Sequence, residues 1–217
     1  ILYRLVGSEM CIRDRIGTVS LGNEQDVNDA VQSAKKAFTS FSKTKKKERI
    51  DLLKGLKRIT ERRFEDLAQA MREEMGAPIS MARSAQADAA VGHLESFIGA
   101  LAELKERTLL DSGDILLKEP VGICGLITPW NWPVNQIALK VIPALATGCT
   151  CILKPSEYTP LSAMVYTEII EEAGYPAGVF NLVNGVGDTV GRAMSKHLEI
   201  DMMSFTGSTR AGIMVTK

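Results

Sequence analysis

A regular alternation begins at Ile115, where short apolar runs typical of strands are followed by longer helical patterns. The expected strands lie within 115–127 and at 149–153, 179–183 and 201–205, and the expected helices lie at 134–146, 161–173, 189–196 and from about Ser208. Short strands that alternate with helices indicate right-handed βαβ crossovers, so we predict an α/β fold with a mainly parallel sheet. Ligands bind beyond the carboxyl ends of such strands, and the residues there become candidates for a site.

Three helical patterns precede this region. The first begins at about Asp26, which we expect to cap it. Its apolar face is predicted to comprise Val27, Val31, Ala34 and Phe38. The second pattern covers about 47–75 and is followed by a Gly and a Pro, which commonly end helices. The third is an Ala-rich pattern over about 80–106.

Composition excludes several classes of protein. The 217 residues carry 26 basic and 26 acidic side chains, so the formal net charge is zero, and 45% of the residues are hydrophobic. A disordered tail would be more polar, and a nucleic-acid-binding protein would carry a clustered basic excess, so we expect no nucleic-acid partner. The four cysteines form no CxxC pair, which favours a reducing, cytoplasmic setting. The apolar segments are interrupted before the ~18 residues that span a bilayer, so we expect no membrane segment.

Four segments at expected strand ends could hold a ligand: 128–133, 154–157, 184–187 and 205–209. In the first, Asn131 stands between two tryptophans and two prolines, which would hold its amide stiffly. A preorganised amide donor can stabilise an oxyanion, an effect worth ~3 kcal/mol where it has been measured in hydrolases. The alternative is a turn asparagine beside core tryptophans.

The other three segments have features of a nucleotide site. Lys154 offers a charge and hydrogen-bond donors, and Glu157 can accept from a ribose diol, although a surface salt bridge would also explain this pair. The glycines of 185–191 come close to a dinucleotide fingerprint, but their spacing differs from it, and a turn is the alternative. The segment 207–209 could meet a phosphate or form an ordinary N-cap. Four such segments on successive parallel strands point to a nucleotide.

TPWNWP, LKPSEYTPLSA, AGYPAGVFNLVNG and MMSFTGSTRAG, in this order and spacing, resemble the NAD(P)-dependent aldehyde dehydrogenase superfamily over about 17–217. The resemblance implies N-terminal helices followed by an incomplete Rossmann-like parallel-sheet cofactor domain. It also implies an aldehyde substrate, a homo-oligomer (dimer or tetramer) in the complete protein, and no metal site. NAD is expected rather than NADP, with NADP as a second option, because the Glu157 carboxylate should repel a 2′-phosphate.

The resemblance also assigns roles to individual residues. Asn131 would be the oxyanion-hole amide that polarises the aldehyde carbonyl, and Trp130 would lie beside the cofactor. Lys154 and Glu157 would bind the adenosine ribose. The full cofactor-binding set, which adds contacts to the adenine and the pyrophosphate, is Thr128, Pro129, Trp130, Lys154, Ser156, Glu157, Gly187, Phe205, Thr206, Gly207 and Ser208.

In the family reaction a cysteine thiolate attacks the aldehyde to give a thiohemiacetal, and after hydride transfer a glutamate-activated water hydrolyses the thioester to the acid. That cysteine and that glutamate lie beyond the FTGST segment, and this sequence ends ten residues after Gly207. We therefore expect a fragment of an aldehyde dehydrogenase that is inactive alone. The cysteines at 124, 149 and 151 are expected to be core residues. The alternatives are a non-catalytic nucleotide-binding module and a portion of an acylating or acyl-phosphate-reducing relative.

These expectations divide the chain into four parts. Residues 1–15 do not match the family and are interpreted as an artefactual start, with a divergent N-terminus as the alternative. Residues 16–113 form the helical part, and 114–120 resemble the start of the family's oligomerisation hairpin. Residues 121–217 form the Rossmann-like NAD-binding portion, which is truncated.

Overall fold

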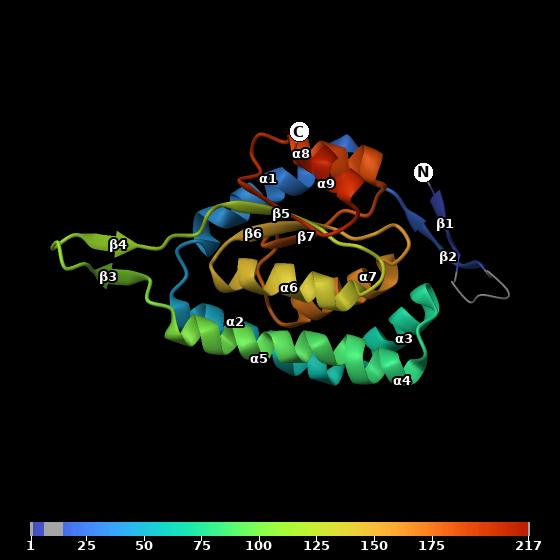
Figure 1. The fold of residues 1–217 in the computed structure, drawn as a ribbon, viewed down its shortest axis with the longest axis horizontal. Helices are drawn as coiled ribbons and strands as arrows, with labels where there is room; N and C mark the ends of the chain where they lie inside the picture. Colours follow the sequence, from blue (N-terminus) through green and yellow to red (C-terminus); the bar gives the residue numbers. More distant parts are fainter. Residues whose placement is uncertain (1, 7–14, 217) are drawn as a thin grey trace.

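At the centre of the protein is a parallel sheet of four strands, seen in a computed structural model that describes residues 2–6 and 15–216 (Figure 1). The strands are β5 (Ile123–Ile127), β6 (Thr150–Lys154), β7 (Phe180–Leu182) and β8 (Met202–Phe205), in the order β7-β6-β5-β8. All three pairings are parallel. The predicted α/β fold with a parallel sheet is therefore confirmed.

Helices cover both faces of the sheet. On one face lie α6 (Pro133–Ala146) and α7 (Pro160–Glu172), and on the other lie α1 (Glu24–Phe41), the π-helical η2 (Gly187–Gly191) and α8 (Arg192–Lys196). Side chains alternate along β5, so Cys124 and Leu126 enter the core beneath α6 and α7, whereas Ile123 and Ile127 enter the core beneath α1. A strand covered on both faces reads as an unbroken apolar run, which is why the pattern of the sequence located it.

A third layer packs outside α6 and α7. It comprises α2 (Lys46–Arg62), α3 (Phe64–Met75), the short α4 (Ile79–Met81), the π-helical η1 (Ala82–Ala87) and α5 (Asp88–Glu103). The single helix expected over 47–75 is wrong, because the chain turns at Arg63. Its guanidinium pairs with Asp66, Glu168 and Glu172, and these contacts fix the corner. The helix expected over 80–106 contains the π turn and ends at Glu103.

The start of α1 also differs from the expectation. Asn23 is the N-cap, since its side chain accepts the N–H of Gln25 at 2.7 Å, and the Asp26 carboxylate accepts the N–H of Asn23 at 2.7 Å. Asp26 therefore completes a capping box from inside the helix instead of capping it. On the apolar face Phe38 is only half-buried, and Phe41 fills the core instead.

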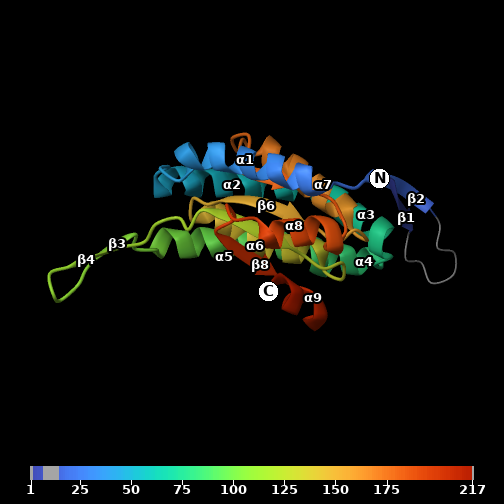
Figure 2. The ribbon, with the colours of Figure 1, turned by 90° about the horizontal axis from the view of Figure 1, so that it is seen from above.

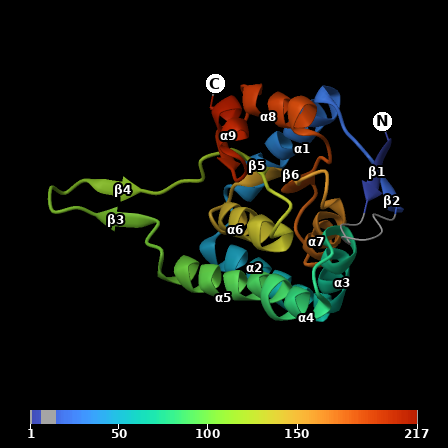
Figure 3. The same cartoon turned by 45° about the vertical axis from the view of Figure 1, so that its right-hand side comes forward.

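Two antiparallel hairpins project from the layered body at opposite sides (Figures 1 and 3). One pairs β3 (Arg107–Leu109) with β4 (Ile115–Leu117), so the first strand of the hairpin expected from residue 114 lies before that position. The other pairs β1 (Leu2–Val6) with β2 (Arg15–Ser20). Residues 1 and 7–14 of the segment that was set apart at 1–15 lie outside the described residues.

The last helix, α9 (Thr209–Val215), follows β8 and stands away from the layers (Figure 2). None of the described helices has the length and apolar character needed to cross a membrane.

Candidate functional site

The carboxyl ends of the four parallel strands meet at one edge of the sheet. Beyond β5, the N–H of Thr128 donates to the carbonyl of Lys154 at 3.2 Å, and beyond β8 the N–H of Thr206 donates to the carbonyl of Ile127 at 3.1 Å. The Lys154 ammonium reaches the carbonyl of Gly185 beyond β7 at 2.7 Å. The fold therefore brings together all four segments that the sequence singled out.

Lys154 is one of the most deeply buried of the candidate residues. Its side chain is only 3% exposed, and its Nζ donates to the carbonyls of Pro155 at 2.8 Å and Gly185 at 2.7 Å. Its Nζ also lies 3.5 Å from a carboxylate oxygen of Glu157. Burial lowers the pKa of Lys154, and the Glu157 carboxylate opposes that effect. The surface salt bridge considered as an alternative is therefore a pair in which the cation is buried, and its main partners are carbonyls.

A hollow of about 430 Å³ opens at the same edge. The last residues of three strands, Ile127, Lys154 and Phe205, line it together with Gly187. A side-chain carbon added at Gly187 would meet no atom within 4 Å, so this glycine borders open space. The hollow unites three of the expected cofactor-binding residues, whereas Thr128, Glu157 and Ser208 are not part of its lining.

The segment beyond β5 is more exposed. Trp130 is 53% exposed, and Asn131 is exposed just before α6 begins. Within residues 15–216, no hydrogen bond holds the amide of Asn131, so this amide is free to meet a ligand. Thr128 is different, because it is buried while its hydroxyl oxygen has no partner in the described part of the chain. An unpaired buried hydroxyl calls for a partner such as a ligand or a water.

Close packing and helix capping explain two of the glycines and the serine in the last two candidate segments. A side-chain carbon at Gly185 would lie 2.3 Å from Val190, so close packing explains this glycine. A side-chain carbon at Gly207 would lie 2.5 Å from the ring of Phe205. The Ser208 side chain accepts the N–H of Ala211 at 3.3 Å, so the N-cap alternative is confirmed for this residue.

The structure adds residues that the motifs did not indicate. Arg192, Ser195 and Lys196 from α8 and Met214 from α9 also line the hollow. Arg192 and Lys196 are exposed, and neither forms an ion pair with any other described side chain. The one available signal was the four-residue spacing of these two cations, which places them on one helix face.

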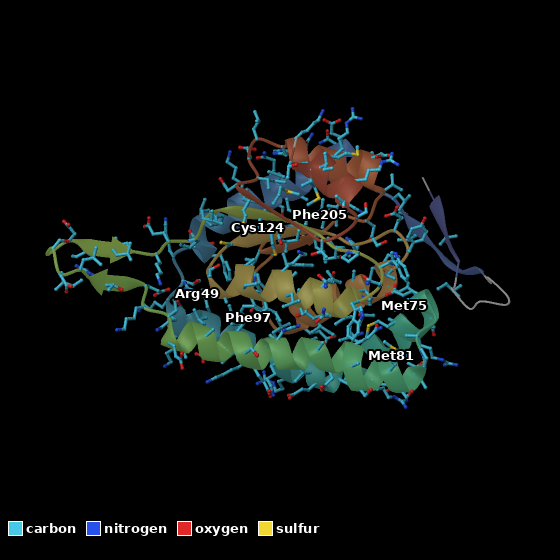
Figure 4. The ribbon with its side chains drawn as sticks, in the orientation of Figure 1. Arg49, Met75, Met81, Phe97, Cys124 and Phe205 are labelled. Carbon is cyan, nitrogen blue, oxygen red and sulfur yellow. The ribbon has the colours of Figure 1, made fainter. Side chains whose placement is uncertain are left out.

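The described cysteines lie at the opposite edge. Cys124 is near the amino end of β5, Cys149 precedes β6, and Cys151 is near the amino end of β6, whereas Phe205 marks the carboxyl edge (Figure 4). All three are buried, as expected for core residues. Burial also raises the pKa of the Cys151 thiol. Since all three thiols lie at the amino ends of β5 and β6, none of them lies beside Asn131 at the carboxyl edge. Residues 2–6 and 15–216 contain no group of three His, Cys, Asp or Glu side chains placed to hold a metal ion.

Known proteins resemble this chain over nearly its whole length. The model of the Aldehyde dehydrogenase family matches residues 11–217, which include the last five residues of the segment 1–15. A 3-succinoylsemialdehyde-pyridine dehydrogenase from Pseudomonas sp is 48% identical over 204 residues, which cover 93% of this chain and 42% of that protein. A putative aldehyde dehydrogenase from Staphylococcus saprophyticus is 43% identical over 203 residues, again 42% of its length.

Solved structures give the same result. Aldehyde dehydrogenase C of Pseudomonas syringae, a mutant complexed with NAD+ and octanal, superposes with a TM-score of 0.96 at 43% identity, over 100% of this chain and 44% of that one. An aldehyde dehydrogenase from Bartonella henselae superposes with a TM-score of 0.96 at 44% identity, over 100% of this chain and 46% of that one. The chain thus spans less than half the length of these proteins.

Proposed function

The chain belongs to the aldehyde dehydrogenase family, and on this premise we propose that it supplies the cofactor-binding part of an enzyme that oxidises an aldehyde to a carboxylic acid with NAD. The observation that carries the proposal is the hollow at the carboxyl edge of the sheet, bordered by Lys154, Gly187 and Phe205. Since the chain spans 42% of its curated relatives, we expect the family's nucleophilic cysteine and general-base glutamate in the remainder of the protein. The chain alone should bind the nucleotide without turning over an aldehyde.

The residues at this edge fit a dinucleotide. The buried hydroxyl of Thr128 and the buried side-chain oxygen of Asn184 have no partner among the described residues, and Gly187 leaves open space. A bound NAD would supply the acceptor for the hydride. Lys154 and Glu157 would hold the adenosine ribose, since an ammonium donates to hydroxyls and a carboxylate accepts from them.

We assign Asn131 to the carbonyl of the aldehyde. Its exposed amide precedes α6, and the N-terminal end of this helix adds a positive potential at the same place. An amide donor there would stabilise the negative charge that develops on the carbonyl oxygen. In the complete enzyme, Asn131→Ala should lower kcat roughly 10²-fold or more while leaving cofactor affinity nearly intact. A defect confined to cofactor binding would overturn this role.

Calorimetry with NAD tests the cofactor assignment on the 217-residue chain. We expect this chain to bind NAD and not to turn over an aldehyde. In the complete enzyme, Glu157→Gln should improve the use of NADP relative to NAD, because the repulsion of a 2′-phosphate is removed. Unchanged cofactor preference would contradict the role of Glu157. Binding by a protein whose complete form also lacks turnover would favour a non-catalytic nucleotide-binding module instead.

We also propose a cytoplasmic homo-oligomer that assembles through the β3–β4 hairpin. Leu109, Leu116 and Leu117 are exposed on this projecting element, and such an apolar surface is typical of a contact between subunits. Light scattering of the complete protein tests this assignment. Charged substitutions at the three leucines should yield a smaller species, and an unchanged mass would refute it.

A further inference from the structure

Glu74 occupies a place in α3 that ordinary helix chemistry disfavours. It lies in the last turn of the helix, where the negative end of the helix dipole repels a carboxylate. Figure 4 labels Met75, the residue that follows Glu74. Glu74 is also only 2% exposed, and no ion pair with another described residue compensates its charge. Acidic side chains are almost never buried unless they have partners, so the contacts of Glu74 require an explanation.

Those contacts lie on a different helix. The Glu74 carboxylate accepts the N–H of Leu161 at 2.6 Å and the N–H of Ser162 at 3.2 Å, and it also accepts the hydroxyl of Ser162. These are groups of the first turn of α7, whose N–H groups have no partner within the helix. The N-cap of α7, Thr159, makes no side-chain cap, and its hydroxyl has no partner within the described residues. Glu74 therefore caps α7 from 87 positions away in the sequence.

This cap fixes one end of a short loop that belongs to the candidate site. Residues 155–159 connect β6 to α7 and contain Ser156 and Glu157. At the other end, Lys154 is anchored in the sheet and to two carbonyls. Within the loop, the N–H of Thr159 donates to the carbonyl of Ser156 at 3.1 Å, so the loop is a tight turn. A turn held at both ends keeps its side chains in one arrangement.

We propose that Glu74 is a positioning residue of the nucleotide site. By holding the N-terminal turn of α7, it sets the place at which the loop presents Ser156 and Glu157 to a bound adenosine ribose. The inference rests on the proposed function for its ligand, but the loop geometry that it explains does not depend on that function. Glu74 itself does not line the hollow.

The test compares three variants with a matched control. Glu74→Ala removes the cap, Glu74→Gln keeps its shape but turns an N–H₂ group toward one of the donors, and Ser162→Ala removes only the hydroxyl contact. The control is Leu94→Ala, because Leu94 is fully buried in α5, a helix that packs on α2 and α6 instead of α7. Leu94→Ala lowers stability without touching the cap.

The first readout is affinity for NAD and for 5′-AMP, measured by calorimetry well below the unfolding temperature of each variant. We expect Glu74→Ala to weaken both affinities roughly tenfold, as loss of a supporting contact behind a binding residue commonly does. Glu74→Gln should weaken them less, Ser162→Ala least, and Leu94→Ala not at all. Unchanged affinity in Glu74→Ala and Glu74→Gln, or an equal loss in Leu94→Ala, would overturn the proposal.

The second readout is amide hydrogen exchange without ligand. In Glu74→Gln, the amides of Leu161 and Ser162 and of the loop 155–159 should exchange faster, while β5 keeps its protection. Uniform acceleration over the whole chain would mean a general structural role and would refute positioning. If the wild-type chain binds neither NAD nor 5′-AMP, the proposed function fails, whereas the exchange experiment still decides whether Glu74 positions the loop.

Discussion

Replacing Lys154 by Met tests whether the ammonium of this residue stabilises the fold by joining two loops at the carboxyl edge. The alternative is that the ammonium adds nothing to stability and only binds a ligand. The substitution preserves most of the apolar stem and removes the ammonium that donates to the carbonyls of Pro155 and Gly185 at 2.8 and 2.7 Å. Both carbonyls then remain beside a buried apolar side chain. The expected result is a less stable protein.

The magnitude follows from these two contacts. Hydrogen bonds from a charged group contribute about 1.5–3 kcal/mol each, and the Glu157 pair adds little because its carboxylate is partly exposed. Removing the ammonium also removes the cost of burying it, which offsets part of the loss. We therefore expect the free energy of unfolding to fall by about 3 kcal/mol. For a chain of this length, that corresponds to a decrease of roughly 6–12 °C in Tm.

Urea unfolding followed by tryptophan fluorescence and circular dichroism measures this change. The matched control is Lys35→Met, because Lys35 is exposed and, among the described residues, forms an ion pair only with Glu199. This substitution should change stability by less than about 1 kcal/mol. A midpoint for Lys154→Met equal to that of Lys35→Met would refute the reasoning. Lys154 would then be free to act on a ligand alone.

Three other changes should also alter stability in ways that urea titrations can measure. Burial raises the pKa of Glu74 to about 7 from 4.5, so the folded state holds its proton more tightly between these values. The contribution of Glu74 to stability should therefore be largest below pH 4.5 and fall by roughly 3 kcal/mol as the pH rises to about 7. The difference in stability between the wild type and Glu74→Gln should follow this fall, and a difference that does not change with pH would refute the reasoning. Gly178 has φ +84°, and an added side-chain carbon would lie 2.6 Å from the carbonyl oxygen of Ser33, so Gly178→Ala should cost roughly 2–4 kcal/mol, and a neutral effect would contradict the geometry. Leu126→Ala should cost about 2–5 kcal/mol by leaving a cavity in the central strand, and a loss below 1 kcal/mol would mean that the core collapses around it.

The sequence predicted those parts of the fold that depend on local patterns. Strands β6 and β8 lie within one residue of their expected bounds, because a short apolar run that is followed by a helical pattern can be recognised in the sequence. The corner at Arg63 was not predicted, because two of the three carboxylates that pair with Arg63 belong to α7, more than a hundred residues away in the sequence. A local sequence pattern does not reveal contacts between residues so far apart in the sequence.

The same distinction holds for the candidate site. Short motifs at strand ends located Lys154 and Gly187, which line the hollow. They gave no indication that Lys154 is buried between two carbonyls, because its partner Gly185 comes from the next strand. Glu74 was missed for the same reason, although an acidic residue in the last turn of a helix was a visible exception to the dipole rule.

Among the described strands, β8 forms an open edge of the sheet, since it pairs only with β5. Its sequence, MMSF, contains none of the charges or prolines with which proteins protect such edges from pairing with a neighbouring chain. Two copies can therefore pair through their β8 strands and extend the sheet. We expect concentrated solutions of the 217-residue chain to aggregate over time. Resistance to unfolding and resistance to aggregation are thus controlled at different places in this molecule: the first in its two cores, and the second at the open edge of the sheet that β8 forms.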